Sequence, residues 1–183
     1  MEQKAKRLAA WLAVHGAATL LLYSIVCQAS GEPQLKDRAP ALTIKTADGG
    51  DFDLEAMRGK VVLVDFWATW CAPCLAEMPA IEKYYRKHKA DGFEVIALST
   101  DKPRNREKAL SVLERNGLPG ALLSDAARNG FGPPDAVPIS YVVDAQGIVR
   151  DRFIEIDEKL LDKVVAPLLK EASAAQEPTD KNK

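Results

Sequence analysis

The 183-residue sequence predicts one mixed α/β domain in which a central sheet is flanked by helices. Two observations predict it. The run of apolar, mostly β-branched residues at 61–67 is typical of a strand buried on both faces. Segments with apolar residues at helical spacing then alternate with further short apolar runs. The length and the 47% apolar content suit a single globular domain with additional terminal segments.

Each element is predicted from a local pattern. The Asp48-Gly49-Gly50 sequence inside residues 41–53 is typical of a β-hairpin, and residues 54–58 should form a short helical turn closed by Gly59. The remaining elements are expected in this order: a strand at 61–67, a helix at 73–89 bent by Pro79, a strand at 93–99, a helix at 104–116, a strand at 120–123, strands at 139–144 and 148–154 joined by a turn, and a closing helix at 157–171.

Residues 8–27 form an uncharged, apolar run that follows three basic residues. Twenty helical residues span ~30 Å, the thickness of the hydrocarbon core of a membrane, and a basic flank keeps the N-terminus in the cytoplasm. We therefore predict a signal anchor at 1–27, with cleavage after Ala29 or lipidation of Cys27 as alternatives. Each fate places the rest of the chain outside the cytoplasm.

The sequence then divides into three further parts. Residues 28–37 are expected to be a polar linker, 38–171 the folded domain, and 172–183 a disordered polar tail. The 25 basic and 26 acidic residues nearly balance, and no charged stripe crosses the domain. The charge pattern therefore predicts no nucleic-acid partner.

Cys71 stands between the buried strand and the helix that follows it, and Cys74 lies in the first turn of that helix. A helix N-terminus presents unpaired N–H groups and a positive dipole end, which should lower the pKa of Cys71 and make it nucleophilic. Cys74 lies one turn further in and should attack the mixed disulfide that Cys71 forms. Pro73 suits the first helical turn, where its missing N–H costs nothing. The pattern predicts a redox-active pair.

Other uses of this cysteine spacing need residues that the chain lacks. A zinc module needs a second pair of ligands, but the only histidines are His15 and His88. Haem attachment would need a histidine where Leu75 stands, and a thiol peroxidase would need Thr or Ser where Ala68 stands. We therefore expect neither a metal nor a cofactor at this site.

The stretch Val64-Asp65-Phe66-Trp67-Ala68-Thr69-Trp70-Cys71-Ala72-Pro73-Cys74 resembles the active-site segment of the thioredoxin superfamily. The N-terminal anchor, the leading hairpin, Glu77-Met78-Pro79 and the long stretch before Pro138 make the chain similar to the membrane-anchored bacterial TlpA/ResA-like reductases. The resemblance covers roughly residues 38–170. It implies a thioredoxin-like fold with an N-terminal β-hairpin extension and an inserted helix–strand element.

The resemblance also implies roles for individual residues. Val137-Pro138 matches a cis-proline that presents a backbone edge to a substrate peptide, with a trans proline at the start of a strand as the alternative. Asp65 matches a buried acid that moves protons to and from the inner cysteine. Glu77 matches an acid that tunes cysteine reactivity, although the helix dipole also favours Glu there. The residues expected to contact substrate are Trp70, Ala72, Pro73, Val137 and Pro138, with packing as the alternative for Trp70.

The implied activity is protein-disulfide reduction at the extracytoplasmic face of a bacterial cell envelope, with residues 8–27 as the inner-membrane anchor. The implied clients are apocytochrome c or the copper-site cysteines of respiratory oxidases, and the implied electron donor is a membrane thiol–disulfide protein. The chain lacks the Gly-Val-x-Gly-x-Pro-Glu pattern of dedicated cytochrome c maturation thioredoxins, and residues 130–136 are unusually rich in proline beside the groove of Pro138.

Two alternatives of the same fold remain. One is a disulfide oxidase or isomerase, although Ala72-Pro73 lacks the histidine that oxidising members carry. The other is a copper-binding chaperone, which the two-residue spacing of the cysteines disfavours.

Overall fold

The computed structural model describes residues 32–176. The expected signal anchor, Cys27 and residues 177–183 lie outside this range. Within 32–176, no helix is both long enough and apolar enough to cross a membrane.

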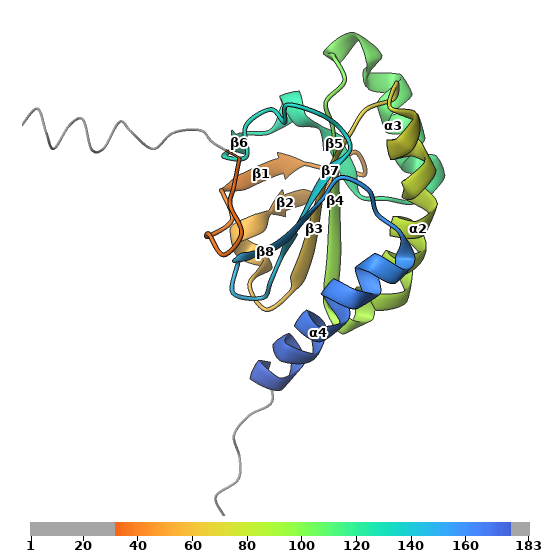
Figure 1. The fold of residues 1–183 in the computed structure, drawn as a ribbon. Helices are drawn as coiled ribbons and strands as arrows, with labels where there is room; N and C mark the ends of the chain where they lie inside the picture. Colours follow the sequence, from red (N-terminus) through yellow and green to blue (C-terminus); the bar gives the residue numbers. More distant parts are fainter. Residues whose placement is uncertain (1–31, 177–183) are drawn as a thin grey trace, which may run out of the picture. The chain divides into compact units, whose positions relative to one another are not determined.

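The centre of the domain is a five-stranded mixed sheet with the strand order β5-β4-β3-β7-β8 (Figure 1). Its strands are β3 (Val61–Trp67), β4 (Phe93–Ser99), β5 (Gly120–Leu122), β7 (Ile139–Val143) and β8 (Val149–Phe153). The pairs β3–β4 and β4–β5 are parallel, whereas β3–β7 and β7–β8 are antiparallel. Every residue of β3 is buried, so the predicted burial on both faces is confirmed.

Three helices pack on one face of this sheet: α2 (Ala72–His88), α3 (Arg106–Asn116) and α4 (Glu158–Gln176) (Figure 1). Their apolar stripes meet one side of β3 and β4 in a continuous core. The buried residues of this core include Leu63, Val95, Met78, Ile81, Leu113, Leu161 and Val165. Helix α3 is capped at its C-terminus by Gly117, whose φ of 60° is a left-handed conformation that glycine adopts without strain.

The other face of the five-stranded sheet packs against a small sheet with the strand order β2-β1-β6. The predicted hairpin is confirmed as β1 (Leu42–Lys45) and β2 (Asp51–Asp53), and β6 (Arg128–Asn129) pairs with the other edge of β1. The sequence did not predict β6, because two polar residues carry no periodic signal. The apolar residues between the two sheets include Leu42, Ile44, Phe52, Val62, Val64 and Phe66.

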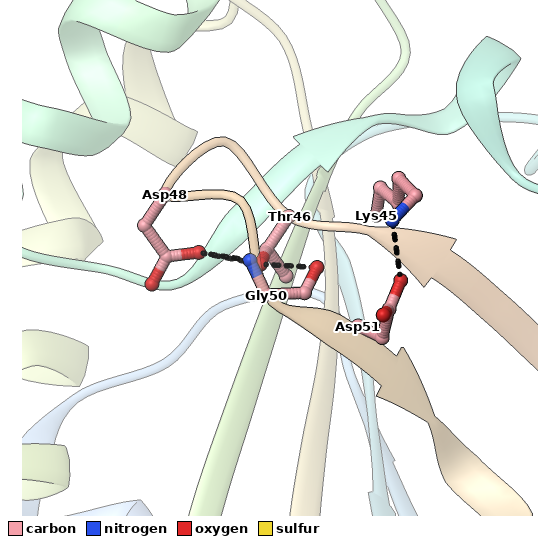
Figure 2. Close-up of polar contacts among 5 residues, drawn as sticks. All are labelled: Lys45, Thr46, Asp48, Gly50 and Asp51. Carbon is pink, nitrogen blue, oxygen red and sulfur yellow. Dashed lines mark hydrogen bonds and ion pairs between the residues drawn. The ribbon is translucent and has the colours of Figure 1, made fainter.

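Polar contacts hold the turn of this hairpin (Figure 2). The Gly50 N–H donates to Asp48 Oδ1 at 3.4 Å, and Thr46 Oγ1 donates to the Gly50 carbonyl at 3.0 Å. Lys45 Nζ and Asp51 Oδ1 lie 3.0 Å apart across the strands. Gly49 has a φ of 87°, which explains why glycine occupies the tip.

Two predicted boundaries need correction. Helix α4 continues to Gln176 rather than ending at 171, because Ala172 is buried and Gln176 Nε2 donates to the Gly59 carbonyl at 2.8 Å. Residues 172–176 therefore belong to the domain and not to a disordered tail. The end of the predicted linker also belongs to it, since the Lys36 N–H donates to the Val149 carbonyl at 2.8 Å.

Candidate active site

The two cysteines lie where β3 leads into α2. Cys71 caps the helix, and the Cys74 N–H donates to its Sγ at 3.3 Å. The two are joined by a disulfide with an S–S distance of 2.04 Å. Cys71 is 4% exposed and Cys74 is 1% exposed, so both cysteines are almost completely buried. One N–H group of the first helical turn, that of Cys74, thus points at the sulfur of the capping residue, at the positive end of the helix dipole.

Asp65 is a carboxylate buried in the middle of β3, with no exposed surface. Ser140 Oγ donates to Asp65 Oδ1 at 2.6 Å, and Asp65 Oδ2 has no hydrogen-bond partner among residues 32–176. Burial raises the pKa of Asp65 from 3.8 to about 6, while the Ser140 hydrogen bond acts to lower it. The group can therefore exchange a proton near neutral pH.

Glu77 is a second buried acid, on α2 three residues after Cys74. Its Oε2 accepts the Ile156 N–H at 3.0 Å, and its Oε1 has no partner in the described part of the chain. The pKa of Glu77 is raised from 4.5 to about 7, mainly by burial and then by the negative charge of Asp65, with a smaller contribution from Glu155, while the Ile156 hydrogen bond acts to lower it. A glutamate placed only by the helix dipole would be solvated, and this one is 7% exposed.

The Val137–Pro138 peptide bond is cis. It directly precedes β7, whose Ile139 pairs with Phe66 of β3. Pro138 therefore lies at the end of β3 from which the cysteine segment continues, and Val137 packs against the core that contains both cysteines.

The proline-rich segment before Val137 borders a cavity of about 440 Å³ at the end of β4. Pro133 and Pro134 line this cavity together with Thr100 and Asp101. The sequence prediction that residues 130–136 share the groove of Pro138 stays a prediction.

The remaining expected contact residues form the exposed surface around the cysteines. Trp70 is 69% exposed, and Ala72 and Pro73 are also exposed. A core packing role for Trp70 does not fit this exposure. The site thus has an exposed apolar rim and, on the underlying strand and helix, the two buried acids.

Ser140 was not among the predicted site residues, and only its register opposite Asp65 reveals its role. The one available signal was a serine inside an apolar strand two residues after Pro138. The contact of Ile156 with Glu77 involves its backbone and left no signal in the sequence.

No group of three or more His, Cys, Asp or Glu residues able to hold a metal occurs within residues 32–176. The described histidine, His88, lies at the far end of α2, where its Nδ1 is 3.0 Å from Asp91. Among residues 32–176, this site offers a copper ion the sulfurs of Cys71 and Cys74 and no histidine.

Comparisons with known proteins agree with this geometry. The AhpC/TSA family matches residues 35–152. The thiol-disulfide oxidoreductase ResA of Bacillus anthracis is 30% identical over 148 residues, which cover 78% of this chain and 83% of ResA. The thioredoxin-like protein YneN of Bacillus subtilis is 32% identical over 133 residues, 67% of this chain and 76% of YneN. A secreted thiol-disulfide isomerase of Corynebacterium glutamicum, of known structure, superposes with a TM-score of 0.60 at 25% identity, over 72% of this chain and 85% of the isomerase.

Proposed function

Because this chain belongs to the AhpC/TSA family and is a thiol–disulfide oxidoreductase of thioredoxin fold, we propose that it reduces disulfide bonds of partner proteins outside the cytoplasm. The observation that carries the proposal is the Cys71–Cys74 disulfide at the N-terminus of α2, with Asp65 and Glu77 buried on the strand and helix that hold it.

The reaction begins with both cysteines reduced. The Cys71 thiolate attacks one sulfur of the client disulfide, forms a mixed disulfide with it, and releases the other client sulfur as a thiolate that takes up a proton. Cys74 then loses its proton and attacks Cys71 Sγ. This step forms the Cys71–Cys74 disulfide and releases the second client thiol. The client gains two electrons, both from the cysteine pair. Of its two protons, one matches the proton that Cys74 loses and the other comes from solvent, to which the Cys71 thiol gave its proton on ionising.

The two buried acids supply the proton transfer at Cys74. A general base works best when its pKa lies near the operating pH, and the pKa values of about 6 for Asp65 and about 7 for Glu77 satisfy this condition. Because the charge of Asp65 raises the pKa of Glu77, the ionisation of one acid makes the other harder to ionise. We assign the transfer to the pair.

The reducing direction is favoured by the residues between the cysteines. Ala72 and Pro73 offer no charged or hydrogen-bonding side chain that would stabilise a Cys71 thiolate beyond the helix N-terminus. A less stabilised thiolate makes the disulfide harder to reduce and its dithiol form the better reductant.

The basic-flanked apolar run at 8–27 supports an envelope location with an inner-membrane anchor. The Corynebacterium relative carries the word secreted in its name. In that location, a membrane protein with a reduced dithiol would return two electrons to Cys71–Cys74. The clients we propose are apocytochrome c or copper-site cysteines of respiratory oxidases.

The second candidate is a disulfide isomerase, and the name of the same Corynebacterium relative favours it. An isomerase also uses Cys71 as the attacking thiolate, but it lets the client re-form a different disulfide before Cys74 acts. The site geometry is common to both activities, so a measured equilibrium must separate them.

The deciding measurement is the equilibrium reduction potential of Cys71–Cys74 in the full chain carrying Cys27→Ser, so that only this pair titrates. We expect a value near that of thioredoxin, about −270 mV, or lower. A value near about −120 mV would reverse the proposed electron flow. In cells, Cys74→Ser should accumulate mixed disulfides with clients, whereas Cys71→Ser, the matched control, should accumulate none.

A further inference from the structure

We infer that Asp101 is a positioning residue for the redox loop, defined as residues 68–71, and that it acts by clamping Thr69. The inference rests on the proposed function of Cys71 as the attacking thiolate. Neither Asp101 nor Thr69 was among the site residues predicted from the sequence.

The clamp consists of two short hydrogen bonds from one residue to one carboxylate. Asp101 follows β4 and is 4% exposed. Its Oδ2 accepts the Thr69 N–H at 2.7 Å, and its Oδ1 accepts the Thr69 hydroxyl at 2.8 Å. Thr69 stands two residues before Cys71, so both its backbone and its side chain are held next to the nucleophile.

The carboxylate is itself held by residues on either side of it. Ser99 Oγ donates to Asp101 Oδ2 at 2.8 Å, and Asn105 Nδ2 donates to Oδ1 at 3.3 Å. Each oxygen thus accepts two hydrogen bonds, which uses the acceptor capacity of an ionised carboxylate. The clamp therefore has a fixed anchor at the end of β4.

Neighbouring contacts transmit the position of Thr69 to Cys71. The Cys71 N–H donates to the Ala68 carbonyl at 3.1 Å and closes the redox loop into a turn. Thr100, the residue before Asp101, donates its N–H to the Trp67 carbonyl at 2.8 Å. The chain on both sides of Ala68 is therefore fastened to the end of β4, and a shift of Thr69 would carry the closed turn with it.

The charge state of Asp101 separates its role from that of the two buried acids. Burial acts to raise the pKa of Asp101, but the hydrogen bonds from Thr69, Ser99 and Asn105 outweigh it and lower the pKa. Asp65 and Glu77 each have an oxygen without a partner in the described chain and a raised pKa, as proton carriers need. Asp101 stays ionised with both oxygens occupied, which suits a group that holds and does not exchange protons.

Asp144 provides a matched control. It is equally buried at 4% exposure and accepts the Gln146 N–H, the Ile148 N–H and Arg150 Nη1, each at 2.9 Å. It holds the turn between β7 and β8, next to the end of β3 opposite the cysteines, because Val143 pairs with Val62. Its loss should destabilise the fold without affecting the redox loop.

The test measures the pKa of Cys71 from the pH dependence of its alkylation by iodoacetamide, in the reduced full chain carrying Cys27→Ser. Thr69→Val removes the hydroxyl donor and keeps the shape, the Thr69 N–H and the charge of Asp101. A loosened loop lets Cys71 leave the N–H groups of α2, so its pKa should rise by about half to one unit and alkylation at neutral pH should slow roughly three- to tenfold. Asp101→Asn places an amide N–H donor against the two Thr69 donors. It should raise the pKa of Cys71 at least as much as Thr69→Val does.

Three results would overturn the positioning role. A purely electrostatic Asp101 would show a lower Cys71 pKa in Asp101→Asn and no change in Thr69→Val. If general loosening of the fold were the cause, Asp144→Asn would raise the pKa of Cys71 as much. If Thr69→Val left the pKa of Cys71 unchanged, the clamp would have no effect on the nucleophile. Should Asp101→Asn fail to fold, Thr69→Val and Asp144→Asn still decide. Alkylation of Cys74 before Cys71 in the parent chain would instead refute the proposed function.

Discussion

Replacing Asp65 by Asn should change how the stability of the oxidised protein depends on pH. In the folded protein, burial raises the pKa of Asp65 from 3.8 to about 6, against the opposing Ser140 hydrogen bond. In the unfolded chain the carboxyl titrates near 3.8, so the folded state binds the proton more tightly. The contribution of Asp65 to the free energy of unfolding is therefore largest below about pH 4 and falls as the pH rises through the folded pKa.

The size of this loss follows from the two pKa values. At ~1.4 kcal/mol per unit, the step from 3.8 to about 6 corresponds to roughly 3 kcal/mol. Asn has the same shape but no titrating proton, so this part of the loss disappears. Its amide nitrogen would sit where Oδ2 has no partner among residues 32–176, which costs ~1–3 kcal/mol at every pH. The slope against pH, and not the stability at one pH, is therefore the quantity to compare.

The assay is urea unfolding of the oxidised chain between about pH 4 and pH 8, where the intact disulfide keeps Cys71 and Cys74 from titrating. Wild type should lose stability across this range, and Asp65→Asn should lose about 3 kcal/mol less. The remaining slope should come largely from Glu77, whose pKa is raised from 4.5 to about 7, and Glu77→Gln should flatten it. Parallel curves for wild type and Asp65→Asn would refute a buried, raised-pKa Asp65.

Two further predictions concern the surface and the C-terminus. Trp70→Ala removes a side chain that is 69% exposed, so the free energy of unfolding should change by less than about 0.5 kcal/mol. The KM for a protein disulfide should rise several-fold. An unchanged KM would exclude Trp70 from client binding. A chain ending at 171 should unfold about 1–2 kcal/mol more easily than one ending at 176, because it loses the burial of Ala172 and the bond from Gln176 to Gly59. Equal denaturation midpoints would mean that the last turn of α4 contributes nothing.

Much of the fold was predictable because its signals are local. Seven consecutive positions, six of them apolar or aromatic and the fifth Asp65, predicted β3, and its observed bounds match those predicted. The spacing of Leu75, Met78 and Ile81 predicted α2, and the turn sequence around Gly49 predicted the hairpin. The cysteine pair was placed correctly for the same reason, since a strand, two cysteines and a helix follow one another along the chain.

The partners within the site were not predictable in this way. Ser140 lies 75 residues from Asp65, and Ile156 lies 79 residues from Glu77. Their contacts depend on the register of β7 against β3 and on the path of the chain from β8 into α4. Periodicity reports which face of an element is apolar, but it does not report which distant residue meets that face.

The sequence by itself therefore determined the strand–cysteine–helix segment and the expectation that Cys71 caps a helix, because these depend on neighbours in the chain. Only the tertiary structure decided that Glu77 is buried, that Asp65 has one partner, and that Asp101 holds Thr69. The physical reason is that desolvation and hydrogen-bond satisfaction are set by the atoms surrounding a group. Those atoms come from strands and helices that meet only when the chain has folded.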